Sequence, residues 1–330
     1  MPQITRRSLL ASAAATAALA AGGAIAQNDI AVPDSLAGKS ILITGTSSGF
    51  GRLMAEDFAR KGAKVFATMR NLPRPEADEL RALAGADGLD LTVIEIDVTD
   101  DAQVTAGVGE AERLAGGALD VLVNNAGIST AGPIEIQDME ATQLLFDTNV
   151  YGPHRLMRAA LPAMRAARSG QIFNVTSQLG RVIVPAFGQY SPTKFALEAM
   201  SEQIAYELVP HNIDVTIIQP GGYPTEIWAN ANRLTQGLLD RAEDTHLAGY
   251  PDIVEQLRSR SGGGGETDPM DVPNAIAAII AMPPGTRPLR RPVHPGPKPQ
   301  VPINAASRDA QLGWLASSPY GPWVRSVHNA

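Results

Sequence analysis

The chain has 330 residues with a formal net charge of −7, and it is 44% hydrophobic and 18% charged, as is ordinary for a soluble globular enzyme. It contains no cysteine, which excludes disulfides and thiolate nucleophiles, and its five histidines lack the spacing of a zinc motif, so we expect no metal. No run of lysine and arginine marks a nucleic-acid surface, so we expect small-molecule chemistry.

The first 26 residues resemble an export signal. Arg6 and Arg7 precede a weakly apolar, alanine-rich stretch that ends in Ala24-Ile25-Ala26, the small-x-small pattern of a signal peptidase site. Twin arginines in this setting are typical of a signal that carries folded proteins across a bacterial inner membrane. We therefore predict a twin-arginine signal peptide over residues 1–26 and a periplasmic protein. The alternatives are a retained membrane anchor and an alanine-rich helix of the fold.

Strand and helix patterns alternate through the next part of the chain. Apolar runs without polar alternation, each followed by a helical pattern, are typical of a parallel sheet covered on both faces. The fold class is therefore α/β, a doubly wound parallel sheet of Rossmann type in a single domain over residues 27–300. The expected strands are 40–44, 64–68, 91–96, 121–123, 171–176, 214–218 and 289–293, and the expected helices are 50–60, 76–83, 101–114, 192–208 and 271–281.

Two later segments are expected to depart from this alternation. Residues 222–268 have few strand signals and are interpreted as a lid or substrate segment, with Gly262–Gly265 as a flexible hinge or loop. Eight prolines between Pro283 and Pro302 predict an extended stretch rather than a helix. Residues 301–330 are a C-terminal extension that we expect to pack on the body or on a partner subunit.

A glycine-rich turn follows the first strand. Thr44–Gly51 reads TGTSSGFG, and Gly45, Gly49 and Gly51 let backbone N–H groups approach a pyrophosphate at the start of a helix. Ser47, Ser48 and Phe50 complete this predicted cofactor turn. The same letters match G-x-S-x-G, the nucleophile elbow of a serine hydrolase, and Asp271 and His294 follow in the right order. A hydrolase using Ser47 is therefore an alternative, weakened because the elbow ends the first strand.

The end of the second strand indicates which nucleotide is bound. An NAD site calls for Asp or Glu there, to accept hydrogen bonds from the adenosine ribose, whereas this chain has Met69 followed by Arg70. A guanidinium pairs well with a 2′-phosphate, so NADP is favoured over NAD.

Further polar residues follow the later strands in order. Tyr190 and Lys194 are four residues apart, and residues at this spacing share one face of a helix. Pro192 is tolerated only in a first turn, which places Tyr190 at the helix entrance, beside Ser177 at the same sheet edge. The other residues of this series are Asp97, Val98, Asn124, Asn125, Ala126, Gly127 and Asn149.

Together these motifs resemble the short-chain dehydrogenase/reductase family, in its single-domain form. The resemblance runs from Lys39 to Ile227 and on to Val293, and the stretch around Ser177 is most similar to NADP-preferring hydroxysteroid and retinol dehydrogenases. It implies a catalytic tetrad of Asn149, Ser177, Tyr190 and Lys194. It also implies that Thr44, Gly45, Gly49 and Gly51 form the cofactor turn, Asp97 contacts adenine, the Asn124–Gly127 motif stabilises the sheet, and Pro220, Gly221 and Thr225 line the nicotinamide.

The expected reaction is NADP-dependent interconversion of a carbonyl and an alcohol, with Tyr190 as general acid and base. We expect the Lys194 ammonium and a positive nicotinamide to lower the pKa of Tyr190, and Asn149 to position a water that leads protons out. Phe187, Tyr223, Ile227 and Trp228 flank the expected mouth, which suits a largely apolar alcohol or ketone. The family resemblance implies a homodimer or homotetramer. The alternative in another class is an exported NADP-binding protein with little turnover.

Overall fold

A computed structural model describes residues 31–260 and 262–330, and residues 32–330 form one unit. The export signal that we expect over residues 1–26 lies outside the described residues. None of the helices in the described part of the chain is long and apolar enough to span a bilayer.

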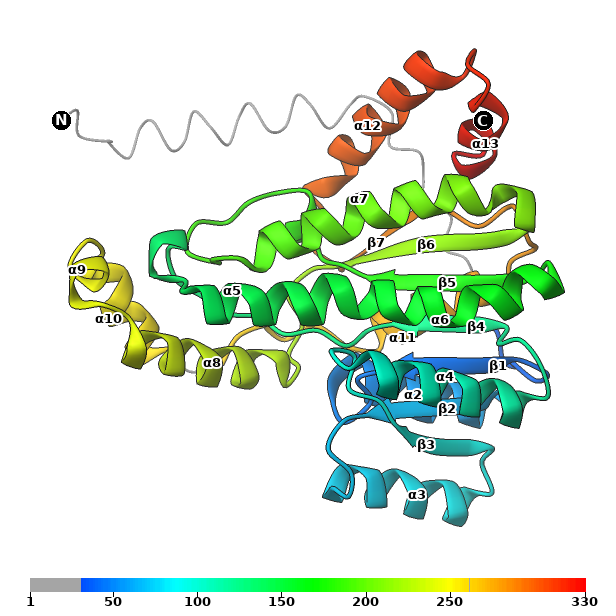
Figure 1. Ribbon diagram of the computed structural model, residues 1–330, viewed down its shortest axis with the longest axis horizontal. Coiled ribbons are helices and arrows are strands. Elements are labelled where there is room, and N and C mark those ends of the chain that lie inside the picture. Colours follow the sequence, from blue (N-terminus) through cyan, green and yellow to red (C-terminus); the bar gives the residue numbers. More distant parts are fainter. Residues whose placement is uncertain (1–30, 261) are drawn as a thin grey trace. The chain divides into compact units, whose positions relative to one another are not determined.

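Seven parallel strands form one sheet in the order β3-β2-β1-β4-β5-β6-β7 (Figure 1). The strands are β1 (Ser40–Thr44), β2 (Lys64–Met69), β3 (Leu91–Glu95), β4 (Val121–Asn124), β5 (Gly170–Val175), β6 (Ile213–Pro220) and β7 (Arg290–Val293). The chain runs outward from β1 to β3, then returns to place β4 on the other side of β1. The doubly wound parallel sheet predicted from the sequence is confirmed.

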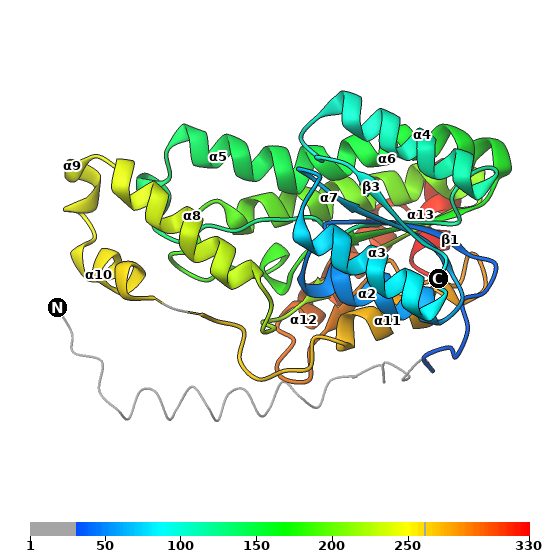
Figure 2. The same cartoon turned by 90° about the horizontal axis from the view of Figure 1, so that it is seen from below.

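Helices cover both faces of this sheet (Figure 2). They are α2 (Gly49–Arg60), α3 (Pro75–Asp87), α4 (Asp101–Ala115), α5 (Met139–Phe146), α6 (Gly152–Ala167), α7 (Tyr190–Leu208), α8 (Ile227–Arg241), α9 (Asp244–Leu247), α10 (Pro251–Ser259), α11 (Asp271–Ile280), α12 (Gln300–Leu315) and α13 (Gly321–Val327). α2 and α11 pack together on one face, and α4 and α6 pack together on the other. A buried core that includes Leu42, Leu122, Ile172, Leu156 and Met157 fills the space between the strands and the second pair of helices.

The central strands bring the predicted site residues to one sheet edge because they are paired in register. Ile41 pairs with Val121, and Asn124 of β4 pairs with Asn174 of β5. Parallel strands in register end at the same level, so the turns after β1, β4, β5 and β6 meet at the carboxyl edge. This is the edge at which doubly wound sheets bind their ligands.

The C-terminal part differs from expectation in one respect. The proline-rich stretch was expected to be extended as far as Pro302, but α12 begins at Gln300 and includes Pro302 in its first turn. A proline in the first turn costs no intrahelical hydrogen bond, because the N–H groups there have no helical partner. The sequence rule therefore fails at this position, and the extension is helical.

Candidate active site

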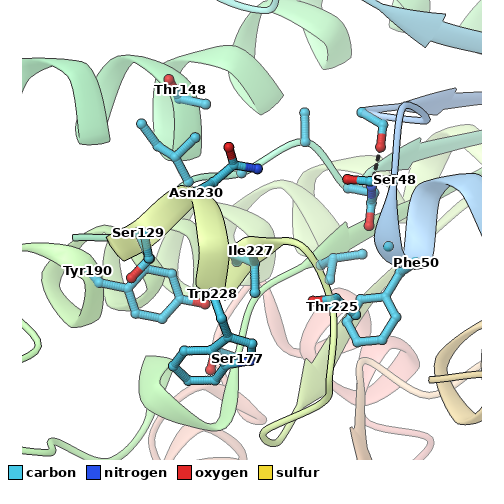
Figure 3. A pocket seen from close by; sticks show the side chains of 18 of the residues that line it. Ser48, Phe50, Ser129, Thr148, Ser177, Tyr190, Thr225, Ile227, Trp228 and Asn230 are labelled. Atoms are coloured by element: carbon cyan, nitrogen blue, oxygen red, sulfur yellow. Dashed lines mark hydrogen bonds between the residues drawn. The ribbon is translucent and has the colours of Figure 1, made fainter. Parts of the chain in front are cut away.

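A cleft of about 780 Å³ lies at the carboxyl edge of the sheet. Residues from the turns after β1, β2, β4, β5 and β6 line it, and α8 lies across it. Figure 3 shows Ser48 and Phe50 on one side, Tyr190 on the other, and Ile227 and Asn230 of α8 between them, with Trp228 overlapping Ser177 in this view. The cleft therefore joins the predicted cofactor turn to the predicted catalytic residues.

The glycine turn after β1 is closely packed and fits a dinucleotide phosphate. A Cβ atom on Gly51 would lie 2.2 Å from the carbonyl oxygen of Gly45, and one on Gly45 would lie 2.9 Å from Cα of Ala126. Within the described chain the side chain of Ser48 caps no N–H group of α2. The first N–H groups of α2 therefore remain available to an anion at the cleft.

The far end of the cleft presents charge suited to an adenosine ribose. Asp97 follows β3, and one of its carboxylate oxygens accepts hydrogen bonds from the backbone N–H (3.0 Å) and hydroxyl (2.7 Å) of Thr99. Its other oxygen lies 3.9 Å from Nη1 of Arg70, a half-exposed side chain that also lines the cleft. Arg74 lines the same end, but Glu76 holds its guanidinium. Arg70 is therefore the more weakly engaged of these two guanidinium groups.

The Asn124–Gly127 segment connects three strands through hydrogen bonds. The side-chain amide of Asn124 donates to Oδ1 of Asn174 at 2.8 Å, and that of Asn125 donates to the carbonyl oxygen of Thr44 at 2.8 Å. The hydroxyl of Thr44 accepts from the backbone N–H groups of Asn125 and Ala126, both at 3.0 Å. These contacts fix the β4 turn against the glycine turn.

Tyr190, Ser177 and Lys194 are all buried at one wall of the cleft. The hydroxyl of Ser177 lies beside that of Tyr190, and Ser177 Oγ accepts a hydrogen bond from the backbone N–H of Leu179 at 3.0 Å. The ammonium of Lys194 donates to the carbonyl oxygen of Val175 at 3.0 Å and lies 5.6 Å from the centre of the Tyr190 ring. A hydroxyl pair beside a buried cation is suited to exchanging a proton with a substrate oxygen.

Burial within the protein shifts the pKa values of Tyr190 and Lys194. Burial raises the pKa of Tyr190 to about 12, and the hydrogen bond from Ser177 opposes only part of this rise. Burial lowers the pKa of Lys194 to about 8. We expected the Lys194 ammonium and a positive nicotinamide together to lower the pKa of Tyr190. Among the protein's own groups, desolvation of the phenolate dominates, and the ammonium lies over the ring rather than at the hydroxyl. A lowering by the two cations together stays a prediction.

Asn149 lies behind the cleft wall rather than in it. It sits in a π-helical turn, Asp147–Tyr151, between α5 and α6. Its Oδ1 accepts from the backbone N–H of Ile128 at 2.9 Å, and its Nδ2 donates to the carbonyl oxygen of Ile128 and to the hydroxyl of Thr193. Asn149 therefore joins the β4 turn to α7, and its amide is held by protein groups. A water held by Asn149 stays a prediction.

Much of the lid segment is helical, and its four successive glycines lie in a loop, as one of the two expected alternatives has it. Two of them are closely packed. A Cβ atom on Gly263 would lie 2.5 Å from Cδ2 of Trp228, and one on Gly264 would lie 2.1 Å from the carbonyl oxygen of Tyr223. The indole N–H of Trp228 donates to that same oxygen at 2.8 Å. The guanidinium of Arg260 lies within 6 Å of the ring centres of Phe187 (5.7 Å) and Trp228 (5.3 Å). Glycine is required here because the backbone passes against the indole.

The residues proposed for a serine hydrolase do not form a triad. The carboxylate of Asp271 accepts from the hydroxyl of Tyr223 at 3.0 Å, and Nδ1 of His294 accepts from the N–H of Gly296 at 3.0 Å. In the described chain no hydrogen bond or ion pair joins Ser47 to either of them. His294 instead packs against Gly221 and the Tyr223 ring.

Most of the predicted site residues line the cleft together. They are Gly45, Ser47, Ser48, Gly49, Phe50, Arg70, Asp97, Val98, Ala126, Gly127, Ser177, Tyr190, Lys194, Pro220, Gly221 and Thr225. Thr44, Gly51, Asn124 and Asn149 lie outside the lining and support it. The sequence did not single out the lining residues Asn71, Arg74, Ile128, Ser129, Leu144, Thr148, Gln178, Leu179, Val184, Asn230, Ala231, Arg233 and Leu234. For Asn230, Ala231, Arg233 and Leu234, the helical periodicity of α8 was the one sequence feature that could have placed them on the face toward the cleft.

This fold and site define a class of protein. A doubly wound parallel sheet, a glycine turn after its first strand and a tyrosine–lysine pair at the same edge are the features of a dinucleotide-binding oxidoreductase. The sequence model described as "short chain dehydrogenase" matches residues 39–235. The chain belongs to the short-chain dehydrogenase/reductase family and is an oxidoreductase.

Known proteins similar to this chain agree with the family. Retinol dehydrogenase 8 of Homo sapiens is 35% identical over 259 residues, covering 77% of this chain and 80% of its own length. A short-chain dehydrogenase/reductase of Burkholderia phymatum in complex with NAD has a TM-score of 0.66 and 25% identity, covering 84% of this chain and 95% of its own. A gluconate 5-dehydrogenase of Burkholderia cenocepacia in complex with NADP and tartrate has a TM-score of 0.55 and 28% identity, covering 59% and 76%. These structures support a nicotinamide cofactor. Because one holds NAD and the other NADP, they do not distinguish between the two for this chain.

Proposed function

We propose that this oxidoreductase uses NADP to interconvert a carbonyl and an alcohol, with Tyr190 as the general acid and base. The observation that carries the proposal is the buried hydroxyl pair of Ser177 and Tyr190 beside Lys194, at one end of a cleft whose other end is a phosphate-fitting glycine turn. A bound nicotinamide supplies or accepts the hydride.

The chain's own residues perform the proton chemistry. In the reducing direction, charge develops on the carbonyl oxygen as the carbon gains a hydride, and Tyr190 donates its phenolic proton to that oxygen. Ser177 donates a hydrogen bond to the same oxygen, because its own Oγ is already oriented by the N–H of Leu179. In the oxidising direction Tyr190 accepts the proton. Lys194, together with the positive charge of an oxidised nicotinamide, favours the phenolate that does so.

The preference for NADP is supported by the end of the cleft beyond β2. Arg70 lines this end from a half-exposed position. Among the described residues its guanidinium is paired only at long range, with Asp97, so it can turn to a 2′-phosphate. No carboxylate stands at the end of β2, where a ribose of NAD would be recognised.

The substrate proposed is a largely apolar alcohol or ketone. The cleft near the hydroxyl pair is lined by apolar side chains, namely Leu179, Val184, Phe187, Ile227 and Trp228. Such a lining favours binding of an apolar ligand, because both surfaces are then removed from water. A relative named retinol dehydrogenase fits this chemistry. Burial of the substrate would also keep water from the developing oxyanion.

We further propose a periplasmic location and a homodimer or homotetramer. The location rests on the twin-arginine pattern of the first 26 residues. The assembly rests on exposed apolar side chains of α5 to α7, which include Met139, Tyr151 and Phe195.

The experiment that tests the function starts from the exported protein, purified without added nucleotide. Absorbance and mass spectrometry of the released small molecules should identify NADP(H), and the protein should oxidise NADPH with decanal, an apolar aldehyde, faster than with glyceraldehyde. A protein that is purified without nucleotide and binds no added NADPH would contradict the proposal.

Arg70→Asp should move the cofactor preference toward NAD. Hydrogen bonds between charged groups contribute about 1.5–3 kcal/mol, so the ratio of kcat/KM for NADPH over NADH should fall by roughly 10- to 100-fold. Arg81→Asp makes the same charge change on α3, outside the cleft, and is the control. An unchanged ratio in Arg70→Asp would remove this residue from the cofactor site.

A further inference from the structure

A buried carboxylate lies one helical turn beyond Lys194 in α7. The side chain of Glu198 is 2% exposed. Its Oε1 accepts hydrogen bonds from the hydroxyl of Thr176 and from Nε2 of Gln219, both at 2.8 Å, and its Oε2 accepts from Nε of Arg290 at 2.9 Å. A buried charge persists only where its partners compensate the lost hydration, so this group is fixed by all three.

The partners of Glu198 adjoin the residues that line the cleft. Thr176 directly precedes Ser177, and Gln219 directly precedes Pro220 and Gly221. Glu198 itself is on the helix that carries Tyr190 and Lys194. One carboxylate therefore joins the turn after β5, the end of β6 and α7. The relative placement of these three segments sets the hydroxyl pair against Pro220 and Gly221 in the cleft.

The C-terminal extension reaches the same carboxylate from outside. The side-chain amides of Asn304 in α12 and Gln219 pair reciprocally, with Nδ2 of Asn304 donating to Oε1 of Gln219 at 2.7 Å and Nε2 of Gln219 lying 3.4 Å from Oδ1 of Asn304. Gln300 also donates to the backbone carbonyl oxygen of Gln219, at 3.4 Å. This pairing orients Gln219 so that its remaining N–H reaches Glu198.

A second contact of the extension supports the charged side of the network. Arg290 binds both Glu198 and Glu202, and the hydroxyl of Tyr206 links Glu202 to His328, the residue after α13, at 2.8 Å from the imidazole Nε2. Burial alone would lower the pKa of Arg290, but the two carboxylates outweigh it and raise that pKa. Both ends of the extension, α12 and the residue after α13, thus meet one buried network, and both lie beyond residue 235, where the family match ends.

We propose that Glu198 is a positioning residue for Ser177 and for the Pro220-Gly221 turn, and that Asn304 makes the C-terminal extension a working part of the active site. The proposal rests on the proposed function, because it assigns the network to the placement of groups that act in that reaction. Asn304 is not among the residues that line the cleft, so we expect its effect to pass through Gln219 and Glu198.

The test compares Asn304→Ala with Gln311→Ala in the full chain. Both replacements truncate an amide side chain of α12. Within the described residues Asn304 pairs with Gln219, whereas the side chain of Gln311 has no hydrogen-bond partner. Asn304→Ala is preferred to a change at Glu198, since removing that carboxylate leaves Arg290 without one of its partners and the chain can fail to fold. Glu198→Gln is the second variant, because it keeps an acceptor for Thr176 and Gln219 while it removes the charge and the acceptor for Nε of Arg290.

Two measurements separate positioning from stability. In hydrogen–deuterium exchange, Asn304→Ala should exchange faster than Gln311→Ala at the N–H groups of Leu179, Gly180 and Gly221, while α4 exchanges equally in both. In turnover of decanal, counted per nucleotide-loaded site well below the unfolding temperature, kcat should fall about 5- to 50-fold with the Kd for NADPH within about threefold. Glu198→Gln should lose less kcat than Glu198→Ala.

Each result decides the proposal. Equal exchange at the three N–H groups in Asn304→Ala and Gln311→Ala overturns it, whatever the activity. Equal kcat per loaded site in the two variants also overturns it, and leaves the proposed function intact if the unmodified chain turns over. Failure of the unmodified chain to oxidise NADPH with any carbonyl would instead count against the proposed function, while the exchange comparison would still decide the placement of the turns.

Discussion

Replacing Tyr190 with phenylalanine is expected to lower kcat by roughly 10²- to 10⁴-fold, the usual contribution of a positioned general acid and base. The ring stays in place because phenylalanine keeps its buried shape, and Ser177 keeps its hydrogen bond from Leu179. The proton donor at the substrate oxygen is lost, together with the hydroxyl that lies beside Ser177. The Kd for NADPH, measured by fluorescence titration, should therefore change by less than about threefold, which makes the loss one of transition-state stabilisation.

The matched control is Tyr250→Phe. The hydroxyl of Tyr250 donates to Glu135 at 2.8 Å and lies on the exposed side of the lid segment, outside the cleft lining. This variant loses the same atom and should keep kcat within about twofold, as surface changes usually have small effects. Substantial turnover in Tyr190→Phe would remove Tyr190 from its role. A large rise in the Kd for NADPH would show instead that the hydroxyl supports the shape of the cleft.

The sheet could be predicted from the sequence because each buried strand is a short apolar run with a turn signal after it. Ser40–Thr44 was predicted to the residue, and β2 and β4 each extend one residue further than expected. A strand buried on both faces needs apolar side chains at successive positions, so a short continuous apolar run indicates such a strand. The order of motifs then placed the glycine turn, Ser177 and Tyr190 at one sheet edge.

The features that the sequence did not predict depend on contacts between segments far apart in the chain. Nothing near Gly263 and Gly264 indicates that Trp228 packs against them, so the four successive glycines were interpreted only as a flexible hinge or loop. The pKa of Tyr190 likewise depends on how far the phenol is desolvated and where the ammonium of Lys194 points, and neither can be seen in the spacing of two residues. Local pattern predicts an element better than it predicts the surroundings of a side chain.

Gly51→Ala is expected to disrupt the cofactor turn. The added Cβ would lie 2.2 Å from the carbonyl oxygen of Gly45 and 2.6 Å from Nδ2 of Asn125, so the turn or the β4 segment must move. Overpacking at a close contact of this kind typically lowers the free energy of unfolding by about 1–3 kcal/mol. The N–H groups at the start of α2 would move with the turn, and the Kd for NADPH should rise at least about tenfold, equivalent to about 1.4 kcal/mol.

The control is Gly109→Ala in the exposed middle of α4, where an added Cβ meets no atom within 4 Å. Alanine is favoured over glycine in a helix by roughly 0.5–1 kcal/mol, so this variant should be slightly more stable and bind NADPH as the unmodified chain does. Urea unfolding and fluorescence titration measure the two quantities. If Gly51→Ala binds NADPH as tightly as Gly109→Ala, the phosphates do not lie against the start of α2. If Gly51→Ala lowers the free energy of unfolding without changing the Kd for NADPH, Gly51 serves only the packing of α2 on Gly45.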